Sequence, residues 1–297
     1  MDKLAAMTTF VAIVEHGSLT AAARALGKAQ PTMVRSLAML ESRLGVRLLR
    51  RTTRRLALTA EGRDYLERCR RILADVDEAE RAMDSSTVTA RGALRVTAPV
   101  TFGQLFVMPV VNDFLRRWPE VRIDLLLLDR PVDLLEEGLD LAVRIGPLAD
   151  SSMVAVKAGS MRQVVVASPA LLAEMGEPKT PAELAQRPVV RFLGGTGATH
   201  WPFLVDGVIE QVAITPRLTV NQALPAVAAC IAGLGFGRFL AYQVREPLGD
   251  GRLRCVLQNH ELPPLPVSLL TPERRAMSHR LRLLREALRE ALLAATD

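Results

Sequence analysis

The sequence contains few cysteines and few aromatic residues, and it has no long apolar run. Its three cysteines, Cys69, Cys230 and Cys255, are widely separated, and none of their spacings matches a metal or redox motif. An odd number of scattered cysteines indicates reduced thiols. No apolar stretch reaches the roughly 18 residues of a membrane helix, and the first residues lack the basic and apolar regions of a signal peptide. We therefore expect a cytoplasmic protein without a membrane segment.

The motifs of common enzymes and cofactor sites are also missing. The four histidines are scattered and have no zinc-binding spacing: His16, His200, His260 and His279. No nucleophile elbow is present. Three glycines at 233, 235 and 237 superficially suggest a dinucleotide site, but they follow a predicted helix and precede a predicted strand, whereas the fingerprint needs the opposite order. We therefore expect neither an enzyme nor a cofactor.

The positive charge of the chain is concentrated in its first fifth. Residues 1–60 contain ten Lys or Arg against three acids, a net charge of +7, whereas the whole chain carries +6. The remaining 237 residues therefore have a net charge of −1. At 297 residues the chain is long enough for two or three domains. Such an asymmetry is expected when one small domain binds a polyanion such as DNA.

Three short helices are predicted at the start of the chain. Apolar residues recur at helical spacing over residues 4–14, and Gly17 then breaks the pattern. Ser18 is a suitable N-cap for a second helix over residues 19–26. A third helix begins near Gln30 and Pro31, since proline is tolerated in a first turn. Two short helices joined by a tight glycine turn form a helix-turn-helix.

A hairpin and a long helix follow. Residues 46–58 are rich in β-forming residues around an Arg-Arg-Thr-Thr-Arg-Arg tip, which predicts a β-hairpin wing. Thr59 then caps a helix whose apolar residues alternate in steps of four and three, as in a coiled coil: Tyr65, Cys69, Ile72, Val76, Ala79 and Met83. The alternative is an amphipathic helix that packs on its own domain. We favour a helix that joins two copies of the chain.

The remainder of the chain alternates between strands and helices, which predicts two α/β lobes with a cleft between them. A small polar segment at 85–91 is a plausible hinge. The first lobe is expected to contain strand 94–98, helix 104–117, strand 121–128, helix 131–138 and strand 140–145 in parallel βαβ units. The other predicted elements are strand 162–167, helix 181–186, strands 188–192, 208–214 and 217–220, helix 222–233, strands 235–239 and 267–270, and helix 278–294.

The first sixty residues closely resemble the LysR-type transcriptional regulators. The resemblance is carried by Phe10, Gly17-Ser18-Leu19-Thr20-Ala21-Ala22-Ala23, Leu26-Gly27, Gln30-Pro31, Leu40-Glu41, Leu44-Gly45, Leu48-Leu49, Arg51, Arg54, Leu58-Thr59 and Gly62. It continues more loosely through Ala98-Pro99, Arg144-Ile145-Gly146, residues 221–235 and Val267.

The resemblance implies an α/β protein with an N-terminal all-α winged helix-turn-helix. It implies a DNA-binding domain at 1–59, a dimerising linker helix and hinge at 60–90, and a two-lobed, periplasmic-binding-protein-like effector domain at 91–297. Lobe I is expected at 91–161 and 267–297, and lobe II at 162–266. The family commonly forms tetramers, and dimer and tetramer both remain open for this homo-oligomer.

The third helix and the wing supply the predicted contacts to double-stranded promoter DNA. Gln30 can pair with adenine and the Thr32 methyl can contact thymine, while Arg35 reaches a phosphate. In the family the wing enters the minor groove at positions that Arg51 and Arg54 occupy here. The predicted DNA contacts are Ser18, Lys28, Gln30, Pro31, Thr32, Arg35, Arg50, Arg51, Thr52, Arg54 and Arg55.

The sequence departs from the family beside the Gln-Pro pair. Ala29 and Val34 stand where many members have serines, so both hydroxyl groups are missing. A missing N-cap typically costs about 1 kcal/mol of stability, and a missing hydroxyl removes a backbone or phosphate hydrogen bond. We therefore expect DNA affinity or base preference to differ from that of typical members.

The resemblance also implies a small-molecule effector in the cleft. Backbone N–H groups and the Thr101 hydroxyl at a helix start can hold an anionic ligand, and Asn221 takes a similar place in the other lobe. Arg144 either pairs with a carboxylate or joins two loops. Gly194 to Gly197 is interpreted as a cleft loop. The predicted effector contacts are Val100, Thr101, Phe102, Arg144, Gly195, Thr196 and Asn221.

Two other functions are compatible with parts of this pattern. One is a small-molecule binding protein or enzyme whose first helices only mediate oligomerisation, and the concentration of positive charge argues against it. The other is a DNA-binding architectural protein without sequence preference, which does not need a large C-terminal domain. A sequence-specific transcriptional regulator accounts for both parts of the chain.

Overall fold

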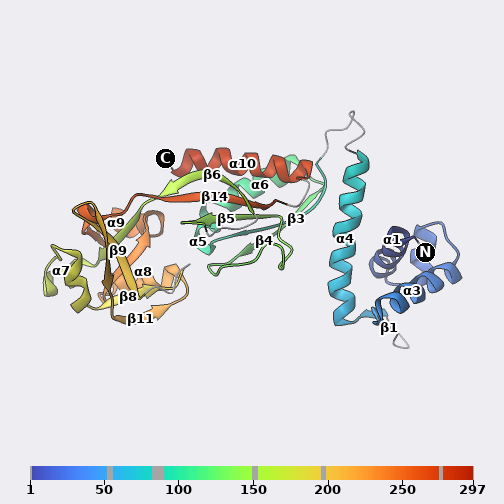
Figure 1. Cartoon of the computed structure of the whole chain (residues 1–297), viewed down its shortest axis with the longest axis horizontal. Coiled ribbons are helices and arrows are strands. Elements are labelled where there is room, and N and C mark those ends of the chain that lie inside the picture. The colour runs from blue at the N-terminus through green and yellow to red at the C-terminus, as the bar shows by residue number, and fades with distance from the viewer. Residues whose placement is uncertain are drawn as a thin grey trace. The chain divides into compact units, whose positions relative to one another are not determined.

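The computed structural model describes residues 2–51, 56–81, 90–148, 153–194, 199–273 and 277–296 (Figure 1). Internal contacts divide the chain into two compact units, Met1–Thr89 and Ala90–Asp297, which we call unit 1 and unit 2. None of the described helices is both long and apolar enough to span a membrane.

Unit 1 contains the predicted helix-turn-helix, hairpin and long helix. Its elements are α1 (Lys3–Glu15), α2 (Leu19–Ala25), α3 (Gln30–Leu44), β1 (Leu49–Arg51), β2 (Leu56–Leu58) and α4 (Ala60–Arg81). The two strands are antiparallel and pair Leu49 with Leu58. These positions confirm the predicted helices and the two strands of the hairpin, while the tip at 52–55 lies outside the described residues.

Capping explains where two of these helices begin. The Ser18 hydroxyl accepts a hydrogen bond from the Ala21 amide at 3.1 Å, as predicted for the start of α2. The Thr59 hydroxyl accepts one from the Gly62 amide at 2.9 Å, which confirms Thr59 as the cap of α4. Ala29 precedes α3 in extended conformation and provides no side-chain hydrogen bond. The structure therefore confirms the expectation from the sequence that α3 lacks a side-chain N-cap.

The hydrophobic core of unit 1 includes the beginning of α4. Phe10 and Ile13 of α1 are fully buried, and the Phe10 ring lies 5.7 Å from the ring of Tyr65. Cys69 is fully buried in the same cluster. The prediction that the whole apolar stripe of this helix faces a second chain is therefore wrong for Tyr65 and Cys69, because these side chains fill the core of their own unit.

Unit 2 contains two mixed sheets. The first has the strand order β4 (Val121–Leu127), β3 (Gly92–Ala98), β5 (Leu141–Ile145), β14 (Leu265–Pro272) and β6 (Met153–Met161). Strand β3 is parallel to both β4 and β5, as predicted, but β14 is antiparallel to β5 and β6. Strand β6 was not predicted, because its exposed and buried residues do not alternate regularly.

Helices cover the first sheet. The segments α5 (Val100–Phe102), η1 (Gly103–Val107) and α6 (Met108–Arg117) are consecutive, and η1 is a π-helical turn. Helix α10 (His279–Thr296) runs along this sheet (Figure 1). Four of its leucines are buried in the same core. A Cβ atom at Gly103 would lie 2.2 Å from the Leu127 side chain, so glycine permits this close packing. The helix therefore starts at residue 100, not at 104 as predicted.

The predicted helix at 131–138 is wrong. Residues 134–138 form only turns between β4 and β5. The Asp133 carboxylate accepts hydrogen bonds from the Leu135 and Glu136 amides, and Leu134 and Leu139 are buried. Gly138 has a positive φ of 64°, which ends the segment before a helix can extend. The apolar residues whose spacing suggested a helix, Leu134 and Leu139, instead anchor a loop by their burial.

The second sheet has the strand order β11 (Pro216–Val220), β8 (Val189–Phe192), β12 (Phe236–Leu240), β7 (Gln163–Ala167) and β13 (Arg254–Val256). Strands β11, β8 and β12 are parallel, and β7 is antiparallel to β12. One face packs on α8 (Ala223–Ile231). The other packs on α7 (Pro169–Met175), the 3-10 turn η2 (Pro181–Gln186) and the antiparallel pair β9 (His200–Val205) and β10 (Val208–Ala213).

The shorter elements complete unit 2. After β12 come the 3-10 turn η3 (Ala241–Val244) and α9 (Arg245–Gly249), and η4 (Gln258–His260) follows β13. Gly233 and Gly235 lie between α8 and β12, and Gly237 lies in β12, so the helix precedes the strand as expected from the sequence. A Cβ atom at Gly235 would lie 2.6 Å from the Pro188 carbonyl oxygen, so this glycine allows two backbone segments to approach closely.

Candidate nucleic-acid interface and ligand cavity

The start of α3 presents polar side chains on the surface of unit 1. Lys28, Gln30, Thr32 and Arg35 are exposed, whereas Met33, Leu37 and Leu40 of the same helix are buried. The buried stripe fixes the rotation of the helix, so the residues between its members face solvent. An exposed helix of this kind can enter a major groove.

The basic residues around this helix have no acidic partners within the described part of unit 1. The only ion pairs recorded there join Arg70 to Glu15 and Glu67. The Glu41 carboxylate accepts hydrogen bonds from the Leu48 and Leu49 amides, at 2.8 and 3.1 Å, and so ties the hairpin to α3. The positive charge of Lys28, Arg35 and Arg50 therefore remains available to an external anion.

Part of the predicted wing lies outside the described residues. Arg50 is exposed on β1, opposite Ala57 of β2. Thr52, Arg54 and Arg55 lie in the hairpin tip, which is not described, and the same holds for the side chain of Arg51. Of the other predicted DNA contacts, Pro31 is exposed in the first turn of α3 and Ser18 is half-buried as the cap of α2.

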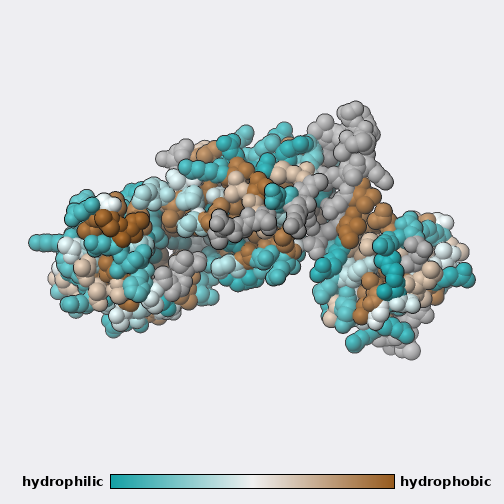
Figure 2. Space-filling view, in the orientation of Figure 1, coloured by the Kyte–Doolittle hydropathy of each residue, from teal (hydrophilic) through white to brown (hydrophobic). Residues whose placement is uncertain are grey.

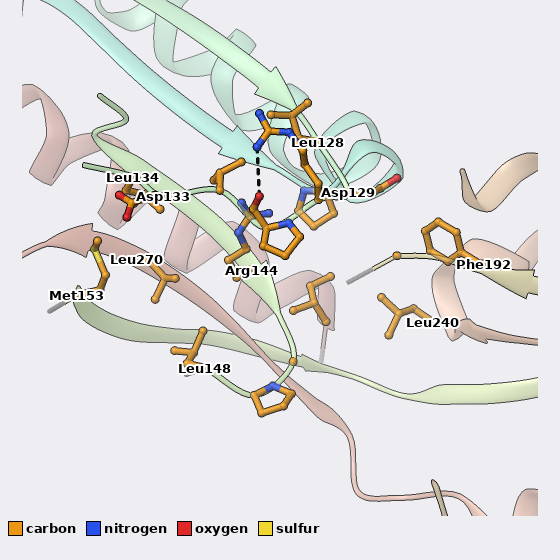
Figure 3. A pocket seen from close by; sticks show the side chains of 18 of the residues that line it. Leu128, Asp129, Asp133, Leu134, Arg144, Leu148, Met153, Phe192, Leu240 and Leu270 are labelled. Atoms are coloured by element: carbon orange, nitrogen blue, oxygen red, sulfur yellow. Dashed lines mark hydrogen bonds between the residues drawn. The ribbon is translucent and has the colours of Figure 1, made fainter. Parts of the chain in front are cut away.

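A cavity of about 410 Å³ lies in unit 2 between the two sheets (Figure 3). The loops after β4 and β5 form one wall, with Asp133, Leu134 and Arg144, and Phe192 and Leu240 lie on the opposite side (Figure 3). Most lining residues are apolar: Pro99, Leu128, Pro131, Val132, Leu134, Ile145, Pro147, Leu148, Met153, Phe192, Leu240 and Leu270. Such a cavity suits a small molecule with an apolar body.

Arg144 is a cavity residue with a buried polar atom that lacks a partner. It lies on β5, its Nη2 atom is buried without a hydrogen-bond partner, and burial lowers the pKa of its guanidinium. Its neighbour Arg130 is already paired with Glu137 at 2.8 Å and donates to the Pro131 carbonyl. Since no described hydrogen bond joins Arg144 to a loop, the loop-joining alternative has no support among these residues.

The protein's own carboxylate occupies the predicted anion site at the start of α5. The Val100 amide donates to Asp129 Oδ1 at 3.0 Å, while Asp129 Oδ2 is buried without a partner. Burial raises the pKa of Asp129, and the Val100 amide and Arg144 partly oppose that rise. Thr101 and Phe102 are buried, and Phe102 belongs to the core of the first sheet. These three residues therefore do not line the cavity, although the preceding Pro99 does.

None of the remaining predicted effector contacts, Asn221, Gly195 and Thr196, is found among the residues that line the described cavity. Asn221 is exposed before α8 and does not line the cavity. Gly195 and Thr196 lie outside the described residues. The preceding residue, Gly194, does line the cavity. Sequence reasoning missed residues 128–134 as cavity residues, because they were divided between the end of a predicted strand at 128 and the start of a predicted helix at 131. The consecutive Leu128, Asp129 and Arg130 at the end of a strand were the available signal, since ligands often bind at the carboxyl ends of parallel strands.

A winged helix-turn-helix with an exposed basic face, in the same chain as a two-sheet domain with an internal cavity, is typical of DNA-binding regulators. Comparisons with known proteins identify the family. The pattern of the "bacterial regulatory helix-turn-helix protein, lysR family" matches residues 4–63, and that of the "LysR substrate binding domain" matches residues 89–293.

Individual relatives support the same family assignment. The chain is 33% identical over 285 residues to the HTH-type transcriptional regulator YhjC of Escherichia coli, covering 95% of each chain. It is 34% identical over 284 residues to the HTH-type transcriptional repressor PA14_22550 of Pseudomonas aeruginosa, covering 95% of this chain and 90% of the relative. The full-length structure of AphB, a virulence activator of Vibrio cholerae, matches with a TM-score of 0.62 at 27% identity, covering 98% and 100%.

The chain belongs to the LysR family of DNA-binding transcriptional regulators. Unit 1 contains its helix-turn-helix domain and unit 2 its substrate-binding domain. It is a regulator, not an enzyme, like the relatives that it matches over nearly its full length.

Proposed function

We propose that this regulator binds specific promoter DNA through α3 and the wing, and that a small acidic molecule in the cavity of unit 2 modulates this binding. The observation that carries the effector part is Arg144, whose buried Nη2 atom lacks a partner beside an apolar cavity. A carboxylate is the ligand group that pairs best with a guanidinium, and the apolar walls favour a hydrocarbon body.

The DNA-binding part is supported by the exposed residues at the start of α3. Gln30 and Thr32 face solvent in its first turn, where the side chains of a recognition helix reach base edges. Arg35 follows on the next turn and Arg50 lies on the hairpin, at places suited to phosphate contacts. Arg51 and Arg54 remain the proposed minor-groove contacts.

A second copy of the chain is proposed to pair with the later part of α4. Ile72 is 39% exposed, although it continues the apolar stripe of Tyr65 and Cys69. Figure 2 shows an apolar area over this helix. Such a pair places two recognition helices in successive major grooves of a pseudo-palindromic site. We also place the protein in the cytoplasm, where promoter DNA is found in bacteria.

The effector proposal is tested with the full chain and a panel of monocarboxylic acids, each beside its neutral amide. We expect at least one acid, and not its amide, to raise the melting temperature and to change the affinity for promoter DNA in a gel-shift titration. Arg144→Gln should weaken binding of that acid at least tenfold, because it removes the unpaired cation.

The matched control is Arg130→Gln, which removes a cavity arginine that already pairs with Glu137. This variant should retain most of the affinity for the acid. Equal affinity of Arg144→Gln and the unmodified protein for every acid, or equal responses to acids and amides, would contradict the proposed role of Arg144.

A further inference from the structure

The cavity of unit 2 contains a second charged group with a missing partner, and its charge is opposite to that of Arg144. Asp129 lines the cavity, and its Oδ1 atom accepts the hydrogen bond from the Val100 amide. Its Oδ2 atom is buried and has no hydrogen-bond partner. Buried polar atoms in folded proteins are normally hydrogen-bonded, so an unpartnered carboxylate oxygen indicates a donor supplied from outside. The cavity therefore presents one guanidinium that lacks an acceptor and one carboxylate that lacks a donor.

Asp129 and Arg144 influence each other without forming an ion pair. Burial raises the pKa of Asp129 and lowers the pKa of Arg144, and the charge of each group partly opposes the shift of the other. Among the residues that the structure describes, no hydrogen bond joins the two side chains, and Asp129 Oδ2 and Arg144 Nη2 both remain unpartnered. In the view of Figure 3, Asp129 lies between Arg144 and Phe192. A molecule that carries both charges can therefore contact each group separately.

The other charged side chains of the cavity already have partners. Asp133 Oδ1 accepts hydrogen bonds from two backbone amides of its own loop, at 2.8 and 3.0 Å. Arg130 pairs with Glu137 at 2.8 Å. Of the described charged residues that line the cavity, Asp129 and Arg144 are therefore the two with a buried atom that has no partner. These two residues define the polar groups that a ligand must carry.

We propose that the ligand of this cavity is an amino acid, whose carboxylate binds Arg144 and whose ammonium group binds the free oxygen of Asp129. The inference rests on the proposed function, namely that a small acidic molecule binds in this cavity, and it adds a second charge to that molecule. An ammonium group suits Asp129, because it donates up to three hydrogen bonds and supplies the positive charge that a buried carboxylate requires. The apolar residues of the lining suit a hydrocarbon side chain.

The test measures binding to the full chain by isothermal titration calorimetry at neutral pH, where the carboxyl and amino groups of the probes are ionised. The probes are hexanoate, 2-hydroxyhexanoate, pentylamine, and the aminohexanoates with the amino group on carbon 2, 3, 4 or 6. We expect at least one aminohexanoate to bind about tenfold more tightly than hexanoate, because it adds a charge-assisted hydrogen bond. Pentylamine should bind most weakly, since it has no carboxylate for Arg144.

Asp129→Asn should remove the preference for an amino group, so that no aminohexanoate binds more tightly than hexanoate. Asparagine keeps the size of the side chain and an acceptor for the Val100 amide, so binding of hexanoate through Arg144 should persist. Asp133→Asn is the matched control, because it removes the same charge from a cavity residue whose acceptor oxygen is already used, and it should leave the preference unchanged. If Asp129→Asn fails to fold by circular dichroism, Asp129→Ser replaces it, because its hydroxyl is also an acceptor.

The outcomes separate this inference from the proposed function. If hexanoate binds through Arg144 and no aminohexanoate binds more tightly, the proposed function stands and the amino-acid ligand is overturned. The same conclusion follows if the preference for an amino group persists in Asp129→Asn, or if 2-hydroxyhexanoate binds more tightly than every aminohexanoate. If Arg144→Gln leaves the affinity for the best aminohexanoate unchanged while Asp129→Asn reduces it, the proposed role of Arg144 fails and that of Asp129 stands.

Discussion

The arginines of unit 1 and those of unit 2 differ in their exposure. In unit 1, Arg35 and Arg50 are exposed and have no acidic partner among the described residues. In unit 2, Arg144 and Arg238 are largely buried, and burial lowers the pKa of both. Exposed cations attract a polyanion at long range, whereas buried cations bind one small anion in a defined geometry. We therefore propose that the same residue type serves two kinds of recognition in one chain.

The largest expected effect on stability and DNA binding comes from a substitution that unfolds one unit and leaves the other folded. Phe10 is fully buried in the core of unit 1, so Phe10→Ala should destabilise this unit by about 3–5 kcal/mol and remove DNA binding. Unit 2 has its own cores and should remain folded. Both tryptophans, Trp118 and Trp201, lie in unit 2, so their fluorescence should melt as in the unmodified protein while the helical signal is lost earlier.

Phe236→Ala is the converse variant, because Phe236 is fully buried in the second sheet of unit 2. Here the tryptophan transition should move to lower temperature while DNA binding persists. If either substitution shifts both transitions equally, the two units unfold together and the comparison between separate units fails.

A smaller effect is expected from the exposed cations. If Lys28, Arg35 and Arg50 of two copies each neutralise one phosphate, DNA affinity should fall by about 10³ between roughly 50 and 200 mM salt. Arg35→Ala should weaken binding by about tenfold and make the salt slope shallower by about 1 for each copy. Fluorescence anisotropy with labelled promoter DNA measures both quantities.

Arg144→Gln provides the contrast for the salt experiment. Its guanidinium is largely buried, so without ligand this variant should retain both the DNA affinity and the salt slope of the unmodified protein. A salt slope unaffected by Arg35→Ala would show that this exposed arginine does not contact phosphate. A changed slope in Arg144→Gln would remove the distinction between the two sets of arginines.

Much of the fold could be predicted from local signals, and unit 1 more completely than unit 2. Ser18, Thr59 and the apolar spacing of the short helices act within a few residues, so the sequence shows them directly. Long-range features were missed. Whether Tyr65 and Cys69 face a second chain or their own core depends on how α1 packs on α4, which periodicity alone does not reveal.

The candidate sites follow the same rule. Exposure of Gln30 and Thr32 follows from the helical stripe that buries Met33 and Leu37, so it could be expected. The role of Asp129 could not, because its carboxylate meets the Val100 amide across 29 positions of the chain.

The smallest expected effect concerns the two helices of the helix-turn-helix itself. Ser18 caps α2, whereas Ala29 leaves α3 without a side-chain cap. The backbone of Ala29 already has the extended conformation of an N-cap, with φ −72° and ψ 139°, so a serine fits without rearrangement. Pro31 has no amide hydrogen, and the new hydroxyl would therefore accept from Thr32. Ala29→Ser should stabilise unit 1 by about 0.5–1 kcal/mol in urea unfolding.

Two further variants make this last prediction specific. Ser18→Ala should destabilise unit 1 by a similar amount, because it removes an existing cap of the same kind. Ala29→Val changes the size of the side chain without adding a hydroxyl, and it should give no gain. Since α3 also provides the proposed base contacts, a better-ordered first turn should raise promoter affinity in Ala29→Ser by a few-fold. The Thr32 amide already donates to the Ala29 carbonyl oxygen at 3.0 Å. Equal stability of Ala29→Ser and Ala29→Val would therefore mean that this bond suffices and that the exposed start of α3 tolerates the missing side-chain cap.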